Sequence, residues 1–327
     1  MKFLHTADWH LGRAIRGKSR ESEHHEALRQ VLACAVEQRV DCLLVAGDLF
    51  DTAAPPPEAE RLAYDFFSEL HGAGIPAVVL AGNHDHPRRI DAVAPLLRAL
   101  DVHAVGRPSA PEDRGLYELE SRDARERAQI ALLPWVTERE AIDFSVLAEA
   151  PTASLGEYAQ RMQEAMNGLV RPFAPDAIHL LMSHLFVDEA EVGVGGGERP
   201  LSVAMGIYGV PRQMLPMAPQ YVALGHIHRP QSVRQSPPAW YSGSLLQLDF
   251  GEQRQQKFVN LIDAHAGQPA EVVQIPIMGR SLVDVGTPSR GVALEDLAGC
   301  RDSVGDAWLR VFVDLSSPVA NLPAVVR

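Results

Sequence analysis

Short apolar runs of strand length alternate along the chain with longer segments of helical periodicity. Strands are predicted at 2–7, 41–46, 75–81, 177–183 and 221–224, because these runs are largely apolar and are bounded by Gly, Asp or Pro. Nearly continuous apolar strands suit a sheet covered on both faces. Two buried helical stripes are predicted between them, Leu28, Val31, Leu32, Ala35 and Val36, and then Ala63, Phe66, Phe67 and Leu70. The alternation predicts a layered α/β core.

The pattern changes along the second half of the chain. Residues 137–171 are predicted to form one or two helices, and strands follow at 240–242, 257–263 and 270–277. Met278-Gly279-Arg280 reads as a boundary, and a strand at 281–286, a helix at 294–301 and a strand at 307–315 predict a small α/β unit after it. We therefore divide the chain into residues 1–278 and 279–327. The second unit is too small for a robust core, so we expect it to pack on the first or to be incomplete.

Composition narrows the class of protein without identifying it. The chain has 327 residues, 46% of them hydrophobic, which is typical of a soluble globular protein of roughly two domains. Cys34, Cys42 and Cys300 lack the spacing of a disulfide framework or metal site, which favours a reducing, cytoplasmic setting. No apolar run approaches the ~20 residues of a membrane span, and the mature chain is expected to start at or near Met1. The net charge of −12 argues against nonspecific coating of nucleic acid.

Five segments end an apolar run with residues that bind metals. They are Asp8-Trp-His10, Gly47-Asp48, Gly82-Asn83-His84-Asp85, Ser183-His184 and Gly225-His226-Ile227-His228. Two carboxylates, an amide oxygen and several imidazoles are the ligand mix of a two-metal hydrolytic site. One Asp-x-His or His-x-His is usually chance, but five such segments after predicted strands indicate a dinuclear centre. Glycines at 47, 82 and 225 let the backbone turn sharply where the ligands converge.

The spacing suggests a role for each group. Asp8 and His10 lie two residues apart, so both side chains can chelate one ion from an extended strand end. Asp48 is the natural bridging carboxylate, since its two oxygens can bind two cations. His226 and His228 can each turn to one of the two ions, with His184 and Asn83 completing the set. His84 is then free to protonate a leaving oxygen or to stabilise the phosphate charge, with Asp85 beside it to hold its tautomer or stabilise its charged form.

Two basic clusters lie directly after metal-ligand motifs. They consist of Arg13, Arg16, Lys18 and Arg20, and of Arg88 and Arg89. Either cluster alone fits a solvated surface loop. Because both are next to candidate ligands, we interpret them as contacts for a polyanionic substrate. His24 and His25, at the start of a helix, are expected to face solvent.

The motifs resemble the calcineurin-like metallophosphoesterase superfamily, whose pattern is D-x-H, G-D, G-N-H-[D/E], a later H and G-H-x-H. Longer stretches at 4–12, 45–52, 80–85 and 223–229 look like the SbcD nuclease family, the bacterial counterpart of the meiotic-recombination nuclease. The resemblance covers about residues 1–265. The archaeal and eukaryotic branch has a histidine three residues after the bridging aspartate, where this chain has Asp51, which we do not assign a catalytic role.

The resemblance implies a layered β-sandwich flanked by helices, with a small C-terminal capping domain. It implies one ion on Asp8, His10, Asp48 and His228, a second on Asp48, Asn83, His184 and His226, and a catalytic His84. The two divalent ions would be manganese, with magnesium or iron as alternatives. The implied activity is DNA cleavage, 3′ to 5′ from duplex ends and endonucleolytic on single strands and hairpins, in processing of double-strand breaks. The implied partners are an SbcC-like coiled-coil ATPase and a second copy of the chain.

Other functions remain open from the residues alone. A phosphatase or a cyclic-nucleotide phosphodiesterase would use the same metal ligands, because these motifs fix the chemistry and not the substrate. A noncatalytic scaffold for an ATPase is a third interpretation, which retention of every ligand and of His84 disfavours. If the family's pairing mode applies, helices at 58–72 and 88–100 form the homodimer surface, although Phe66 and Phe67 also fit an ordinary core.

Overall fold

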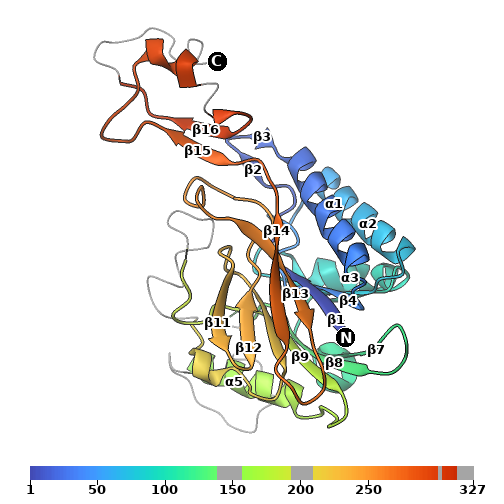
Figure 1. The fold of residues 1–327 in the computed structure, drawn as a ribbon. Coiled ribbons are helices and arrows are strands. Elements are labelled where there is room, and N and C mark those ends of the chain that lie inside the picture. The colour runs from blue at the N-terminus through green and yellow to red at the C-terminus, as the bar shows by residue number, and fades with distance from the viewer. Residues whose placement is uncertain (138–156, 193–208, 301–303, 315–327) are drawn as a thin grey trace.

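Two six-stranded sheets form the centre of this computed structural model, which describes residues 1–137, 157–192, 209–300 and 304–314 (Figure 1). The first sheet has the order β14 (Glu271–Ile277), β13 (Lys257–Asp263), β1 (Lys2–Thr6), β4 (Cys42–Val45), β5 (Ala77–Leu80) and β6 (Val102–Val105). Strands β1, β4, β5 and β6 are parallel, whereas β13 runs antiparallel to both β1 and β14.

The second sheet also combines parallel and antiparallel strands. Its order is β11 (Gln231–Gln235), β12 (Pro238–Tyr241), β10 (Tyr221–Gly225), β9 (Ile178–His184), β8 (Arg127–Leu133) and β7 (Leu116–Glu120). Strands β12, β10, β9 and β8 are parallel, and β11 and β7 are the antiparallel edges. Short helical turns, η1 (Pro111–Gly115) and η3 (Arg212–Met214), lie in the connections.

Helices cover the outer faces of both sheets. Helices α1 (Glu21–Glu37), α2 (Pro57–Gly72) and α3 (Pro87–Arg98) pack on the first sheet, and α5 (Glu157–Val170) packs on the second (Figure 1). A separate apolar layer fills the space between the sheets. This confirms the predicted layered β-sandwich flanked by helices. Among the described residues, no helix is both long enough and apolar enough to cross a bilayer.

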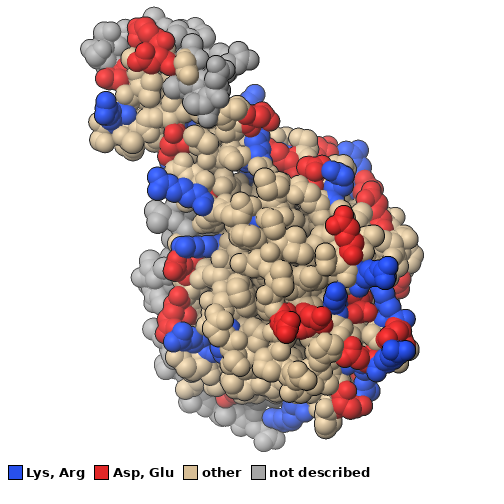
Figure 2. Space-filling view, viewed as in Figure 1, with Lys and Arg blue, Asp and Glu red and all other residues tan. Residues whose placement is uncertain are grey.

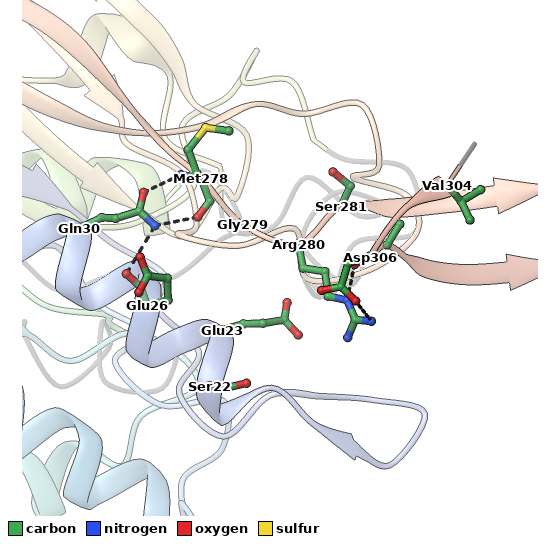
Figure 3. Close-up of a pocket in the computed structure, with 11 residues that line it drawn as sticks. Ser22, Glu23, Glu26, Gln30, Met278, Gly279, Arg280, Ser281, Val304 and Asp306 are labelled. Carbon is green, nitrogen blue, oxygen red and sulfur yellow. Dashed lines mark hydrogen bonds and ion pairs between the residues drawn. The ribbon is translucent and has the colours of Figure 1, made fainter. Parts of the chain in front are cut away.

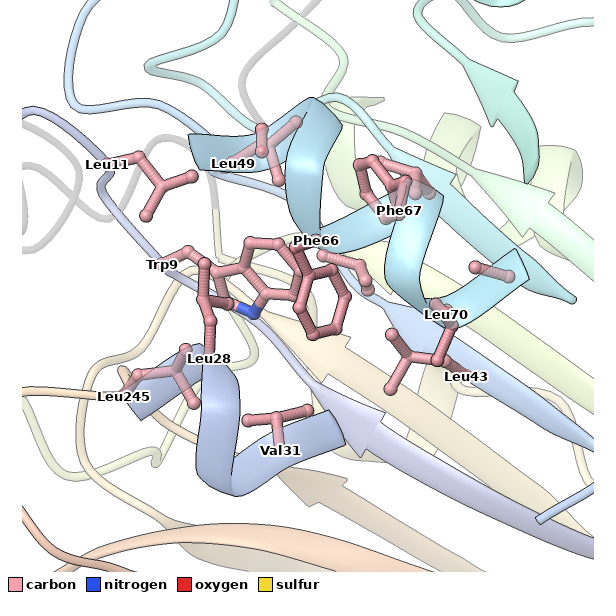
Figure 4. Close-up of a cluster of buried hydrophobic side chains, with 14 of the residues drawn as sticks. Trp9, Leu11, Leu28, Val31, Leu43, Leu49, Phe66, Phe67, Leu70 and Leu245 are labelled. Atoms are coloured by element: carbon pink, nitrogen blue, oxygen red, sulfur yellow. The ribbon is translucent and has the colours of Figure 1, made fainter. Parts of the chain in front are cut away.

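The core beneath α1 and α2 is built around Trp9 (Figure 4). The indole meets Phe66 edge-on, with ring centroids 5.1 Å apart, and stacks on Phe67 at 5.9 Å. Its Nε1 donates a hydrogen bond to Thr6 Oγ1, so the polar atom of this fully buried ring is satisfied. Phe66 and Phe67 are therefore core residues in this structure. Since Trp9 lies between Asp8 and His10 in the chain, this core anchors the first ligand segment.

Two expectations about α1 are wrong. His24 is buried rather than solvent-facing, because it lies one turn before Leu28 on the same face of the helix. Val36 is 49% exposed, because the buried stripe follows His24, Leu28, Val31 and Ala35 and leaves Val36 at its edge. The sequence pattern also missed strands β6, β7, β8 and β11. The part of the predicted helical region at 138–156 lies outside the described residues.

The C-terminal unit contains a parallel pair, β15 (Leu282–Val285) and β16 (Trp308–Val311), and the 3₁₀ helix η4 (Leu294–Cys300). It contacts α1 through Trp308, whose Nε1 donates to Glu23 Oε1 (2.7 Å), and just before it the backbone nitrogen and oxygen of Met278 both bond the Gln30 side chain of α1. A cavity of about 520 Å³ lies along this junction (Figure 3). The division at 278/279 stays a prediction.

Candidate metal centre

The seven candidate ligands meet at one edge of the paired sheets. They follow or end strands β1, β4, β5, β9 and β10, and they are Asp8, His10, Asp48, Asn83, His184, His226 and His228. Parallel strands bring their carboxyl ends to the same edge, here in both sheets. All are buried except Asn83, which is half-buried. The sequence therefore predicted which side chains the fold brings together.

Four of these ligands have a left-handed backbone. The φ angles are 52° at Asp8, 47° at His10, 50° at Asp48 and 104° at His226. Such conformations cost about 1–3 kcal/mol each and persist where surrounding structure fixes them, most often at functional sites. Here the Asp8 amide donates to the Gly47 carbonyl (2.9 Å), and the His10 amide donates to the Asp48 carbonyl (3.1 Å). The two loops thus hold each other in the strained geometry.

The glycines in the motifs make room for the ligands. A Cβ atom at Gly82 would lie 2.1 Å from Asp48 Oδ1, and one at Gly47 would lie 2.1 Å from His184 Nδ1. A Cβ at Gly225 would also crowd His184, at 2.8 Å. Real Cβ contacts are longer than this, so only glycine allows the three strand ends to approach so closely.

The first ligand group contains Asp8, His10 and His228. One ligand atom from each lies within 4.8 Å of the others. His228 Nδ1 donates to the Glu252 carboxylate (2.9 Å), which leaves a lone pair on Nε2. That Nε2 faces His10 Nε2 at 3.2 Å. Lone-pair donors that converge on one point, beside a buried carboxylate, fit a divalent cation.

The second ligand group contains Asp48, Asn83, His184 and His226. His184 Nδ1 donates to the Ala46 carbonyl (2.8 Å), and its Nε2 lies 3.0 Å from Asn83 Oδ1 and 3.5 Å from Asp48 Oδ2. His226 Nδ1 lies 2.8 Å from the same Asn83 oxygen. Amide, carboxylate and imidazole acceptors again point at one another, and this donor set fits a second cation.

Asp48 lies between the two groups. Its Oδ2 is 3.7 Å from His10 Nε2 in the first group and 3.5 Å from His184 Nε2 in the second. Burial opposes its ionisation, but the surrounding imidazoles, His184 foremost, outweigh this and hold the pKa of Asp48 below its usual range. Burial alone would lower the pKa of His184, but the charge of Asp48 outweighs burial and raises this pKa to about 9. The buried charge that attracts a proton here also attracts a metal cation.

His84 lies beside both ligand groups without belonging to the predicted ligand set. Its ring centroid is 4.7 Å from that of His10, and its backbone amide donates to Asp48 Oδ1 (2.8 Å). His84 Nδ1 donates to the Asp51 carbonyl (2.8 Å), because a carbonyl can only accept. The remaining Nε2 can exchange a proton, and the half-buried side chain stays accessible.

Asp85 does not have the contact expected of it. Its carboxylate accepts hydrogen bonds from the backbone amides of Leu49, Phe50 and Gly82, at 3.1, 2.9 and 2.9 Å. Burial, together with the Asp48 charge, raises its pKa to about 6. The prediction that Asp85 fixes the His84 tautomer is therefore wrong. Asp85 ties the loop after β4 to the loop after β5, and the Asp51 carbonyl orients His84.

Several residues around the site were missed or undervalued in the sequence. Asp51 Oδ1 lies 3.2 Å from His10 Nδ1, and Glu252 bonds His228 as described above. The half-buried Trp135 stacks on His226, with ring centroids 5.1 Å apart and 29° between planes. These residues lie far from their partners in sequence and carry no motif. Only the acidic character of Asp51, three residues after Asp48, gave a local signal.

The first basic cluster divides in the structure. Arg16 and Lys18 are exposed on a hairpin formed by β2 (Ala14–Ile15) and β3 (Lys18–Ser19). Arg13 pairs with Asp51 (3.2 Å). Arg20 is 1% exposed, and its guanidinium bonds Glu23 and the Gln247 carbonyl. The prediction that Arg20 binds substrate is therefore wrong, because its charge is buried within the protein.

The second basic cluster lies at the start of α3. Arg88 and Arg89 are both exposed, and Arg89 pairs with Glu60 on α2 (2.5 Å). Acidic and basic side chains are interspersed over the face of the molecule seen in Figure 2. A polyanion that met this face would therefore find basic positions mixed with acidic ones.

Fold and site together define a metallophosphoesterase with a candidate two-metal centre. The family model for calcineurin-like phosphoesterases matches residues 1–230. The SbcD protein of the SbcCD nuclease from Bacillus subtilis (strain 168) is 36% identical over 274 residues, which cover 83% of this chain and 68% of that protein. The SbcD proteins from Rhodobacter capsulatus and Escherichia coli (strain K12) are 33% and 31% identical, over 90% and 85% of this chain and 73% and 69% of theirs. The chain belongs to the calcineurin-like phosphoesterase family and, within it, to the SbcD nuclease subunits, which confirms the predicted resemblance.

Proposed function

We propose that this chain is a manganese-dependent DNA nuclease subunit that hydrolyses phosphodiester bonds. The observation that carries the proposal is the position of His84 beside both ligand groups, 4.7 Å from the His10 ring and hydrogen-bonded to Asp48 through its amide. The relatives named as SbcCD nuclease subunits support DNA as the substrate. By the same likeness we propose an SbcC-like ATPase partner, pairing with a second copy, a cytoplasmic location, and a capping unit from residue 279.

The ligand side chains would divide between two ions. Asp8, His10 and His228 would bind one, Asn83, His184 and His226 the other, and Asp48 would bridge them. Two divalent cations in such a site supply Lewis-acid stabilisation of the attacked phosphate and a nucleophile at neutral pH. Neutral imidazoles are suitable ligands, and burial lowers the pKa of His226 to about 3, which keeps it neutral.

The chain's own residues would carry the proton and orient the substrate. His84 Nε2 would protonate the leaving 3′ oxygen or stabilise the phosphoryl charge, with the Asp51 carbonyl accepting its Nδ1 proton throughout. Asp85 would hold the His84 segment against the Asp48 loop through the three hydrogen bonds that its carboxylate accepts from backbone amides. The basic positions proposed to contact the phosphate backbone are Arg13, Arg16, Lys18, Arg88 and Arg89, of which Arg13 and Arg89 also pair with Asp51 and Glu60.

The test compares substrates on one preparation of the full chain. With Mn²⁺, we expect release of nucleotides from end-labelled duplex DNA and opening of a DNA hairpin. A chromogenic phosphodiester, a phosphate monoester and a cyclic nucleotide serve as the competing substrates. Hydrolysis of the monoester or the cyclic nucleotide with both DNAs left intact would establish the phosphatase or cyclic-nucleotide phosphodiesterase instead.

A further inference from the structure

We infer that Glu252, held in place by Lys257, is a positioning residue that determines which nitrogen of His228 is presented to the metal. This inference rests on the proposed two-metal function and extends it to a buried pair outside the ligand motifs. Glu252 is 1% exposed and Lys257 is 4% exposed. Charged residues buried to this degree need a specific partner, and each of these has several.

The two carboxylate oxygens of Glu252 bind different partners, His228 on one side and Lys257 on the other. One carboxylate oxygen, Oε1, accepts the Nδ1 proton of His228 at 2.9 Å. The other, Oε2, accepts the Lys257 ammonium at 2.7 Å and the Leu248 amide at 3.1 Å. With both oxygens occupied by donors, the carboxylate cannot rotate without losing a charged hydrogen bond. His228 is thereby fixed with its proton on Nδ1 and its lone pair on Nε2.

Lys257 is itself locked. Besides Glu252, three more oxygens lie 2.9 Å from its Nζ, namely Gln255 Oε1, Ser244 Oγ and the His228 carbonyl, so acceptors surround all three N–H donors of the ammonium. The last of these bonds ties Lys257 to the backbone of the same histidine that Glu252 holds by the side chain. The pair is neutral overall, so it orients His228 without adding net negative charge to the ligand group. Such partners of a metal-binding histidine commonly set ring orientation and tautomer.

Glu252→Gln tests the inference with almost no change of shape. The amide must place its NH₂ group either against Lys257 and the Leu248 amide, so that donors face donors, or against His228 Nδ1. The second arrangement favours the proton on Nε2, the tautomer that cannot bind an ion. We expect affinity for one of the two Mn²⁺ ions to fall roughly 10–100-fold, as for other such partners, and affinity for the other ion to stay unchanged.

The readout is the stoichiometry and affinity of Mn²⁺ binding to the metal-free full chain, measured by titration calorimetry and by electron paramagnetic resonance. His228→Ala should weaken the same ion as Glu252→Gln, and the double variant should be no weaker than His228→Ala alone. His184→Ala should weaken the other ion. Glu126→Gln is the matched control, since Glu126 also pairs with a buried cation, the Met1 amine, away from the ligands.

The outcomes separate this inference from the proposed function. Glu252→Gln binding both ions as tightly as the unaltered chain, or weakening both equally, would overturn the positioning role. An unaltered chain that binds no Mn²⁺ would overturn the proposed function, and this inference with it. Should Glu252→Gln fail to fold, Glu252→Asp carries the test, because it keeps the charge beside Lys257 but is one methylene shorter toward His228. Its selective loss of the same ion is the expected result, and wild-type affinity would count against the role.

Discussion

The Nε2 atoms of His10 and His228 face each other at 3.2 Å, with their rings 76° apart. Since the Glu252 contact places the His228 proton on Nδ1, the pair can be bridged by a proton or by a cation. A ligand that binds only the folded state adds about 2.7 kcal/mol of stability at 100 times its Kd. We therefore expect Mn²⁺ to raise the Tm of the EDTA-treated protein by several degrees.

Differential scanning calorimetry in EDTA and in MnCl₂ measures this shift. His10→Ala should remove much of it while keeping the Tm in EDTA within a few degrees of the unaltered chain. Equal Tm values for the unaltered chain in the two buffers would contradict a metal site at this position.

His84→Asn should slow DNA cleavage strongly and leave Mn²⁺ binding intact. Asparagine at this position keeps the hydrogen bond from its backbone N–H to Asp48 Oδ1, but its side chain cannot transfer a proton near neutral pH. Loss of one general acid typically lowers the rate about 10²–10⁴-fold. Single-turnover kinetics measure the cleavage rate of this variant, and Mn²⁺ titration of the same preparation measures its metal affinity. Cleavage by the variant at the rate of the unaltered chain would show that His84 has no role in the mechanism.

Gly82→Ala should damage the metal centre through sterics alone. The added Cβ would lie 2.1 Å from Asp48 Oδ1 and 2.3 Å from the Asp48 backbone nitrogen, so the backbone must move. We expect about 1–3 kcal/mol of destabilisation, typical of overpacking, together with weaker Mn²⁺ binding. Urea denaturation and calorimetry measure the two effects.

Gly168→Ala on α5 is the matched control. A Cβ there meets no atom within 4 Å, so the change should be neutral or stabilise the helix by roughly 0.5–1 kcal/mol. If the two variants behaved alike, the close approach at Gly82 would have no functional meaning.

The sequence predicted which candidate ligands the fold brings together far better than it predicted their surroundings, and the physical reason lies in the range of the interactions. Asp8, Asp48 and His226 each follow an apolar strand, so the local pattern placed them at strand ends. Because parallel strands bring their carboxyl ends to the same edge of a sheet, these residues then lie close together. Glu252 reaches His228 from 24 residues away, in a loop with no periodicity. Nothing local distinguishes it from an exposed glutamate.

Burial of polar residues was the other gap. Arg20 and His24 lie on a helix start that reads as solvent-facing, but both side chains turn inward. Arg20 reaches the Gln247 carbonyl, a partner more than two hundred residues later. Strands β7 and β8 were also missed. Strand β7 is only partly buried, so its apolar pattern is weak. Strand β8 is evident in the structure from its pairing with β9, a contact that the sequence does not show.

The hairpin of β2 and β3 should contribute to DNA binding. Its turn has φ angles of 49° at Arg16 and 75° at Gly17, which presents Arg16 and Lys18 to solvent next to the first ligand segment. Arg16→Ala with Lys18→Ala should weaken duplex binding and reduce the slope of log K against log salt by roughly 1.8, at about 0.9 for each lost phosphate contact. Fluorescence anisotropy at several salt concentrations, in Ca²⁺ to prevent cleavage, measures both.

Arg29→Ala is the control for this prediction. Arg29 is equally exposed on α1 but is already paired with Glu26 (2.9 Å). Its removal should leave the salt slope unchanged, and an equal loss in both variants would indicate a general charge effect instead of a hairpin contact.

The protein should become less stable as pH falls, in part because of His24. Burial, together with the Arg20 charge, lowers its pKa to about 3, and its Nδ1 donates to the Arg20 carbonyl (3.1 Å). The unfolded chain has a histidine pKa near 6.5, so below that pH the unfolded state takes up a proton that the folded state refuses. The free energy of unfolding therefore decreases as pH falls from about 6.5 toward 3, by roughly 2 kcal/mol from this residue at pH 5. His24→Gln should show a correspondingly smaller loss between pH 7 and pH 5 in urea denaturation with EDTA, whatever its absolute stability. A loss equal to that of the unaltered chain would mean that His24 is protonated in the folded state.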